Sequence, residues 1–314
     1  MNTEFQERII TKIRREFGDE IINILNDDKT IELMLNSDGK LWVEKLGSYM
    51  ECWGNFPESK AKSIINSVAS FLDTTANSDN PILECELPID GSRFEALLPP
   101  VVSTPTFTIR KKAIKIFTLE DYQNSNILSQ NQKNIIENAI TTRQNILVVG
   151  GTGSGKTTFC NAIIDGMSRL TPDNRIIIIE DTAELQCSSR NKVILRSTDK
   201  VSMLRLLKAT MRLRPDRIVV GETRGKEALD LLKAWNTGHP GGIATIHANS
   251  AYGGLTRLEQ LISEATPAPM SELISEAVNL VVFIQKIKGG RKIQEIMQVK
   301  GFDKSKNQYI TQQI

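Results

Sequence analysis

The chain has 314 residues, a length that suggests about two ordinary domains. Hydrophobic residues make up 40% and charged residues 24%, so the composition supports packed cores rather than disorder. A formal net charge of +2 argues against a protein that coats nucleic acid. The polar N-terminus lacks the apolar stretch of a secretory signal, and no apolar run approaches the ~20 residues that span a bilayer. We therefore expect a cytoplasmic protein whose membrane contacts, if any, are peripheral.

The first 112 residues combine helical and strand patterns. Apolar residues recur at near-helical spacing over residues 4–17, and Pro57 begins a second helical run that continues to about Leu72. Alternating runs on both sides of Asn36-Ser37-Asp38-Gly39 predict a hairpin. The strands expected here are 31–35, 41–46, 82–87, 92–98 and 106–110. These elements predict a small α+β domain over residues 1–112.

Beyond residue 112 the pattern changes. Residues 113–130 are polar and irregular, as is typical of a linker. From residue 131 to residue 314, short apolar runs alternate with helical stretches, which predicts an α/β domain built on a parallel sheet. The expected buried strands are 146–149, 176–179, 193–195, 218–220, 243–246 and 280–284.

One glycine-rich segment carries the strongest functional signal. The run from Gly150 to Thr157 matches G-x-x-x-x-G-K-[ST], directly after a predicted strand and at the start of a predicted helix. Glycines allow several backbone N–H groups to face one phosphate, and the helix N-terminus adds its positive dipole end. Lys156 is expected to reach the β- and γ-phosphates, and the Thr157 hydroxyl to bind Mg²⁺. The expected nucleotide-binding residues are Gly151, Thr152, Gly153, Ser154, Gly155, Lys156, Thr157 and Thr158.

Hydrolysis of a nucleotide also needs carboxylates near the phosphates. Ends of parallel strands lie in the same crevice as the phosphate loop, and two predicted strands end in Glu180 and in Gly221-Glu222. Because glycine precedes Glu222 where many NTPases have aspartate, Glu222 is predicted to be the general base. Glu180 is then predicted to hold Mg²⁺ through water, although the choice of base between the two stays open. His247 ends a third strand and is a candidate γ-phosphate sensor.

The nucleotide is expected to be ATP. A small GTPase would show an Asn-Lys-x-Asp guanine motif, and Asn191-Lys192-Val193-Ile194 lacks the aspartate. The cofactors predicted from the sequence are therefore ATP and Mg²⁺.

Four blocks resemble the Walker A, Asp box, Walker B and His box of the secretion and traffic ATPases. They are Gly150–Thr158, Ile179–Leu185, Arg212–Gly225 and Thr245–Asn249. The blocks Gly91–Val102, Phe107–Lys111 and Ile116–Leu119 further resemble the conjugative-transfer, type IV secretion branch, with its TrbB-type ATPases. The resemblance implies a RecA-like P-loop NTPase domain at the C-terminus, preceded by a smaller α+β domain.

The same resemblance implies a biological setting. It implies a homo-hexameric, Mg-dependent ATPase that powers substrate transfer or pilus assembly in a conjugation or type IV secretion system. Arg93 and Arg110 match family positions that approach the phosphates from the N-terminal domain. The implied partners are inner-membrane components of the channel, at the cytoplasmic face of the bacterial inner membrane. The near-zero net charge separately leads us to expect no direct nucleic-acid contact.

Other functions compete with this interpretation. A pilus-retraction motor has a similar length, but the block Arg93–Val102 fits it less well. A nucleic-acid translocase of the RecA-like class would favour basic and aromatic residues in alternation, and the chain lacks that pattern. A nucleotide-gated scaffold without turnover is the non-enzymatic alternative.

Two segments are candidates for membrane or partner contact. The helix over residues 4–17 has both charge signs on its polar face, which favours packing on its own sheet. The cluster Lys286, Lys288, Arg291 and Lys292 around Gly289-Gly290 is predicted to be a solvated hairpin tip. Contact with phospholipids or with a partner is the alternative for this cluster.

Overall fold

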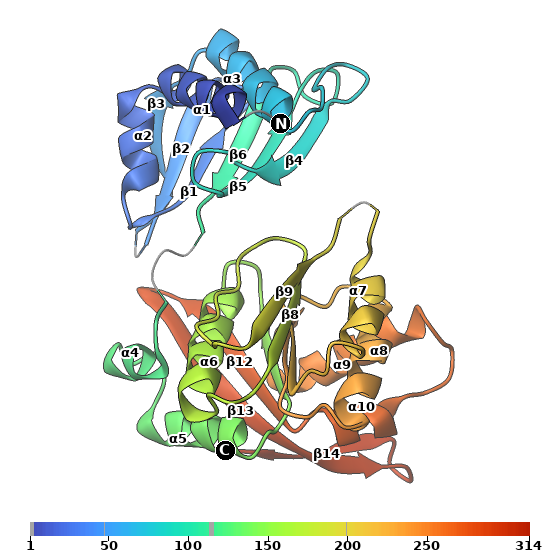
Figure 1. The fold of residues 1–314 in the computed structure, drawn as a ribbon. Helices are drawn as coiled ribbons and strands as arrows, with labels where there is room; N and C mark the ends of the chain where they lie inside the picture. The colour runs from blue at the N-terminus through green and yellow to red at the C-terminus, as the bar shows by residue number, and fades with distance from the viewer. Residues whose placement is uncertain (1–2, 47, 113–115, 199) are drawn as a thin grey trace. The chain divides into compact units, whose positions relative to one another are not determined.

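A computed structural model describes residues 3–46, 48–112, 116–198 and 200–314. The contacts between residues divide the chain into two compact units, Met1–Ile114 and Lys115–Ile314 (Figure 1). Among the described residues, no helix combines the length and apolar content needed to cross a membrane.

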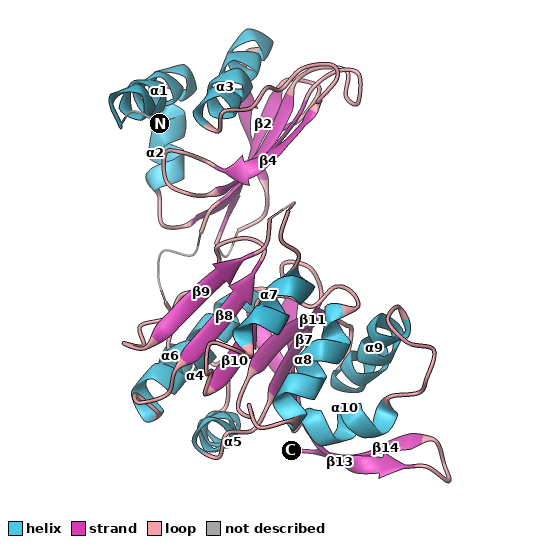
Figure 2. Cartoon of the chain, turned by 45° about the vertical axis from the view of Figure 1, so that its right-hand side comes forward, coloured by secondary structure: helices cyan, strands magenta, loops and turns pink. Residues whose placement is uncertain are grey.

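The first unit contains one antiparallel sheet, which three helices cover on one face (Figures 1 and 2). Its strands are β1 (Thr30–Leu35), β2 (Lys40–Lys45), β3 (Glu51–Asn55), β4 (Ile82–Glu86), β5 (Arg93–Leu97) and β6 (Thr106–Arg110). Its helices are α1 (Thr3–Phe17), α2 (Asp19–Asn26) and α3 (Glu58–Phe71). The strand order is β3-β2-β1-β6-β5-β4. The predicted hairpin is confirmed as β1–β2, with Gly39 in its turn.

Helix α1 packs on its own sheet, as its mixed polar face predicts. Ile13 is fully buried, and the ring of Phe17 contacts Phe107 edge-to-face at 5.9 Å between centroids. The Glu16 carboxylate accepts hydrogen bonds from the hydroxyls of Ser63 and Ser67, which ties α1 to α3. The apolar face of the helix is therefore used within the first unit.

The second unit is built on a mixed sheet of eight strands. Its elements are α4 (Leu119–Asn124), α5 (Gln130–Thr141), β7 (Ile146–Gly150), α6 (Lys156–Leu170), β8 (Ile176–Glu180), β9 (Lys192–Arg196), α7 (Met203–Thr210), β10 (Arg217–Val220), α8 (Glu227–Asn236), β11 (Ile243–His247), α9 (Ala251–Ser263), α10 (Ser271–Ala277), β12 (Leu280–Ile287), β13 (Gly290–Asp303) and β14 (Gln308–Gln313). The strand order is β14-β13-β12-β7-β11-β10-β8-β9. The strands from β12 to β9 in this order run parallel, and β13 and β14 are antiparallel additions. The predicted α/β fold class is thus confirmed.

Helices cover both faces of this sheet, so its central strands are apolar throughout (Figure 1). Leu147 and Val149 of β7 face a core that helices α7 to α10 complete. Ile146 and Val148 of the same strand face a second core that α4, α5 and α6 complete. The alternation along one strand therefore contributes to two cores at once.

One expectation for the linker is wrong. Residues 113–130 were expected to be irregular, but helix α4 occupies residues 119–124, while residues 113–115 lie outside the described part. Thr118 and Asp121 form a capping box at its N-terminus. Leu119 and Tyr122 are buried in the core beside α6. The Thr-x-x-Asp pattern is the signal that predicts this start, and it outweighs the polar composition.

A buried arginine holds together the edge of the sheet where the parallel strands β8, β10 and β11 begin. Arg217 begins β10 and is fully buried. Its guanidinium donates to the Asn174 side chain and to the carbonyls of Gly241 and Ile140, at 2.7, 2.9 and 2.8 Å. Burial lowers the pKa of Arg217 to about 10, so the group stays charged at neutral pH. Arg217 thus joins the segments that precede β8 and β11 to the end of α5.

We predict that Arg217→Ala lowers the free energy of unfolding of the second unit by about 3 kcal/mol, since three buried acceptors lose their donor. Urea titration measures this when Trp42 and Trp53 are replaced by Phe, so that Trp235 alone reports. Arg169→Ala, which removes an exposed arginine, is the control and should cost less than about 0.5 kcal/mol. Equal effects of the two alanine variants would contradict the role assigned to Arg217.

Candidate active site

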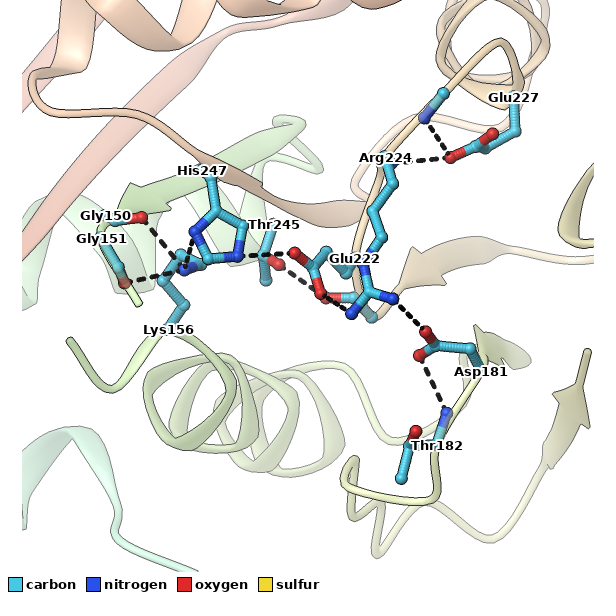
Figure 3. Close-up of polar contacts among 12 residues, drawn as sticks. Gly150, Gly151, Lys156, Asp181, Thr182, Glu222, Arg224, Glu227, Thr245 and His247 are labelled. Carbon is cyan, nitrogen blue, oxygen red and sulfur yellow. Dashed lines mark hydrogen bonds and ion pairs between the residues drawn. The ribbon is translucent and has the colours of Figure 1, made fainter. Parts of the chain in front are cut away.

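The candidate site lies where parallel strands of the second unit end (Figure 3). The phosphate loop follows β7, His247 is the last residue of β11, and Glu180 is the last residue of β8. Glu222 follows β10 by two residues. Because β7, β11, β10 and β8 are adjacent and parallel, the chain delivers these side chains to one edge of the sheet.

The loop after β7 has the strand–loop–helix context that phosphate loops require. Gly153 and Gly155 have φ angles of 67° and 95°, and helix α6 begins at Lys156. A Cβ on Gly150 would lie 2.4 Å from the Ile284 carbonyl oxygen, so only glycine fits at the end of β7. Thr157 and Thr158 occupy the first turn of α6. The predicted nucleotide-binding residues are therefore contiguous around one helix N-terminus.

Lys156 is only 8% exposed, and it faces the interior of the site. Its ammonium donates to the carbonyl oxygens of Gly150 and Gly151, both at 3.0 Å. The same Nζ lies 3.4 Å from Nδ1 of His247 (Figure 3). Lys156 thereby links the loop after β7 to the end of β11.

His247 connects Lys156 to the predicted base. Its Nε2 lies 2.7 Å from Oε1 of Glu222. An ammonium only donates and a carboxylate only accepts, so the contacts assign the Nε2–H tautomer, with the Nδ1 lone pair toward Lys156. Burial and the charge of Lys156 lower the pKa of His247, against the opposing effect of Glu222. At neutral pH this imidazole is therefore uncharged.

Glu222 is also held by Arg224, an arginine of the Arg212–Gly225 block whose role the sequence leaves open. Nη2 of Arg224 donates to Oε2 of Glu222, and Nη1 donates to Asp181 at 2.8 Å (Figure 3). Burial alone would raise the pKa of Glu222, but the hydrogen bond and charge of Arg224 lower it. Arg224 follows Glu222 by only two residues in the sequence, and an acid-rich segment follows β8. These two features are the sequence signal that an arginine could contact Glu222 and Asp181.

The Glu180 carboxylate binds backbone N–H groups of the turn after β8, a role that the sequence does not predict. Its side chain is 2% exposed, and Oε2 accepts hydrogen bonds from the backbone N–H groups of Glu184 and Leu185 at 3.0 and 2.9 Å. Burial raises its pKa. Oε1 is buried and has no hydrogen-bond partner among the described residues. A Cβ on Gly221 would lie 3.2 Å from the Cβ of Glu180, so a larger residue where many NTPases have aspartate would crowd Glu180.

Arg93 and Arg110 belong to the first unit, and the structure brings them together there. They are direct partners on β5 and β6, so their side chains share one face of that sheet. It is the face opposite the buried Phe94 and Ile109. Glu32 pairs with Arg110; burial raises its pKa, and the charges of the two arginines oppose the increase.

The fold and the strand-end site define a P-loop ATPase, and the comparisons with known proteins agree. A model of the family described as "Type II/IV secretion system protein" matches residues 20–309. The probable conjugal transfer protein TrbB of Sinorhizobium fredii is 50% identical over 94% of this chain and 91% of its own. The VirB11 protein of Bartonella henselae is 29% identical over 92% of both chains. The chain therefore belongs to the type II/IV secretion system family and is a traffic ATPase, an ATP hydrolase of the TrbB/VirB11 type.

Solved structures support the architecture. The VirB11 ATPase of Brucella suis is 26% identical, covers 93% of this chain and 96% of its own, and superposes with a TM-score of 0.50. The pilus retraction motor PilT has a TM-score of 0.64, is 23% identical and covers 88% of this chain and 81% of its own, which shows a shared fold. The resemblance inferred from the four sequence blocks is thus confirmed.

We predict that His247 titrates below its ordinary pKa of 6.5, measured by NMR of the imidazole nitrogens. Lys156→Ala should move the midpoint up, because it removes a positive charge. Glu222→Gln should move it down, because it removes the carboxylate that favours the imidazolium. A midpoint above 6.5, or shifts of the same sign in both variants, would contradict the assigned contacts.

Proposed function

We propose that this chain is a Mg-dependent, ring-forming ATPase that powers transfer in a conjugation or type IV secretion system. The observation that carries the proposal is the polar chain from Lys156 through His247 to Glu222, at the edge that also holds the phosphate loop. The conjugal-transfer names of the relatives at 49% and 50% identity support the choice of system. The likeness to PilT supports only the fold.

In this proposal the phosphate loop after β7 binds the phosphates of the nucleotide. The β- and γ-phosphates would accept hydrogen bonds from the N–H groups of residues 151–158 and from Lys156, whose ammonium exchanges its carbonyl acceptors for phosphate oxygens. The α6 N-terminus contributes favourable electrostatics for the anion.

The residues present fit Mg²⁺. This ion takes few protein ligands and keeps phosphate oxygens and water in its octahedral shell. The Thr157 hydroxyl in the first turn of α6 would supply one ligand. Oε1 of Glu180 lies 4.0 Å from Nε of Arg196 and has no hydrogen-bond partner among the described residues, so it is a buried acceptor for a metal-bound water. When bound, the ion would neutralise charge on the β- and γ-phosphates.

Glu222 is the base in this proposal. Its lowered pKa keeps it ionised at neutral pH, and a carboxylate accepts a proton from an attacking water. Both oxygens are engaged, one by His247 and one by Arg224. Catalysis therefore requires that one contact open, and Arg224, which Asp181 also holds, is the partner with an alternative acceptor. His247 lies between Lys156 and Glu222 and is suited to sense the γ-phosphate.

Arg93 and Arg110 supply the remaining positive charge in the proposal. A guanidinium brought to the γ-phosphate by a moving domain would couple hydrolysis to domain motion. We propose that the ring is a homo-hexamer at the cytoplasmic face of the inner membrane, that it engages membrane components of the channel, and that it does not contact nucleic acid directly.

We predict that Glu222→Gln lowers kcat by about 10² to 10⁴ and leaves ATP affinity within a few-fold, because it removes a base but no phosphate ligand. Lys156→Ala should weaken ATP binding itself. Steady-state hydrolysis and nucleotide binding measure the two effects separately. Glu137→Gln, in helix α5, is the matched control and should turn over normally. Normal hydrolysis by the Lys156 and Glu222 variants would refute the site.

We predict that native mass spectrometry with Mg-ATP shows a species of six times the 35.0 kDa protomer mass. Acidic residues outnumber basic ones over residues 1–112, and the reverse holds beyond them, so charge attraction between neighbouring subunits should contribute to assembly. Raising the ionic strength should then shift the distribution toward monomer. A monomer at all salt and nucleotide concentrations would refute the ring.

A further inference from the structure

Arg291 lies at the start of β13, beside the tip of the β12–β13 hairpin, which was predicted to be solvated. The prediction is right for Lys288 and Lys292, which are exposed, and wrong for Arg291, which is half-buried. The strand after it is anchored, since the Ile293 N–H donates to the Ile127 carbonyl at 2.9 Å. The position of Arg291 on β13 is thus held by the packing of Ile293 in the second core and by its hydrogen bond to Ile127.

The Arg291 side chain lies along the phosphate loop. A Cβ on Gly155 would lie 2.7 Å from Cδ and 2.9 Å from Nε of Arg291, so the arginine side chain lies against the loop at this glycine. Nη2 lies 3.5 Å from the Gly153 carbonyl oxygen, a long hydrogen bond. Nε is buried and has no hydrogen-bond partner in the part of the chain that the structure describes. The guanidinium therefore keeps donor capacity beside the loop.

The sheet order indicates which end of a nucleotide would meet this arginine. His247 and Glu222, the residues suited to the γ-phosphate, come from β11 and β10, on one side of β7. Arg291 comes from the hairpin that begins with β12, on the other side of β7. A nucleotide whose phosphates follow the loop from the β11 side would place its ribose and base toward β12 and β13.

We propose that Arg291 is a nucleotide-binding residue that contacts the nucleoside end of ATP and ADP. A guanidinium donates to ribose oxygens and stacks on the face of a base, and it does so beside the anionic phosphates without losing its charge. The proposal rests on the proposed placement of the triphosphate in this loop. It assigns the arginine to affinity for the nucleoside rather than to the chemical step.

The test compares a nucleotide with a probe that has phosphates and no nucleoside. Isothermal titration of the full chain with ADP and with inorganic tripolyphosphate, both with Mg²⁺, is performed on the wild type, Arg291→Ala and Arg291→Lys. We expect Arg291→Ala to weaken ADP about tenfold, as loss of one charge-assisted contact does, and to leave tripolyphosphate within twofold. We expect KM for ATP to rise by a similar factor while kcat stays within twofold. Lys292→Ala removes a neighbouring, exposed charge and should change neither affinity.

Three results would overturn the proposal. Unchanged ADP affinity in Arg291→Ala would show that Arg291 does not contact the nucleotide. An equal loss for ADP and tripolyphosphate would show that Arg291 only shapes the loop, and an equal loss in Lys292→Ala would show a general charge effect. Arg291→Lys, which keeps the charge and the fold, should recover part of the ADP affinity. If the wild type bound neither probe, the proposed phosphate site itself would fail, and that result differs from all three.

Discussion

The polar chain at the strand ends is the interaction on which the site depends. Lys156, His247, Glu222, Arg224 and Asp181 form a line in which donors and acceptors alternate. The Lys156 ammonium can only donate and the Glu222 carboxylate can only accept. Only the neutral Nε2–H imidazole of His247 therefore satisfies both of its contacts. The arrangement thereby keeps Glu222 ionised and His247 neutral at one time, which suits proton transfer from water.

The strand order of the second unit brings the residues of this polar chain together. Its members are far apart in sequence and meet because β7, β11, β10 and β8 are adjacent and parallel. Two apolar cores fix the faces of the sheet, and Arg217 joins the segments at the opposite strand ends. Register errors between these strands would separate His247 from Glu222, so the stability of the fold and the contacts of the site depend on the same strand order.

Much of this was predictable from the sequence. The phosphate loop, the parallel strands of the second unit and the predicted ends at Glu180 and His247 follow from local patterns, because parallel strands are continuous apolar runs. Strands β3, β13 and β14 were not among the predicted strands. Helix α4 was missed, since its six residues carry too few apolar positions for periodicity to show. The contact of Arg224 with Asp181 and the position of Arg291 beside the phosphate loop could not be predicted, because each depends on how segments distant in sequence approach. Glu180 illustrates the same limit, since its backbone partners arise from the turn that follows β8.

The most direct measurement is a structure of the chain with Mg²⁺ and a non-hydrolysable ATP analogue. The account predicts that Nζ of Lys156 leaves the Gly150 and Gly151 carbonyls for phosphate oxygens. It also predicts that Glu222 lies within hydrogen-bond distance of a water in line with the γ-phosphate, with its contact to Arg224 opened. A γ-phosphate bound away from the loop, or an in-line water held by a different carboxylate, would contradict it.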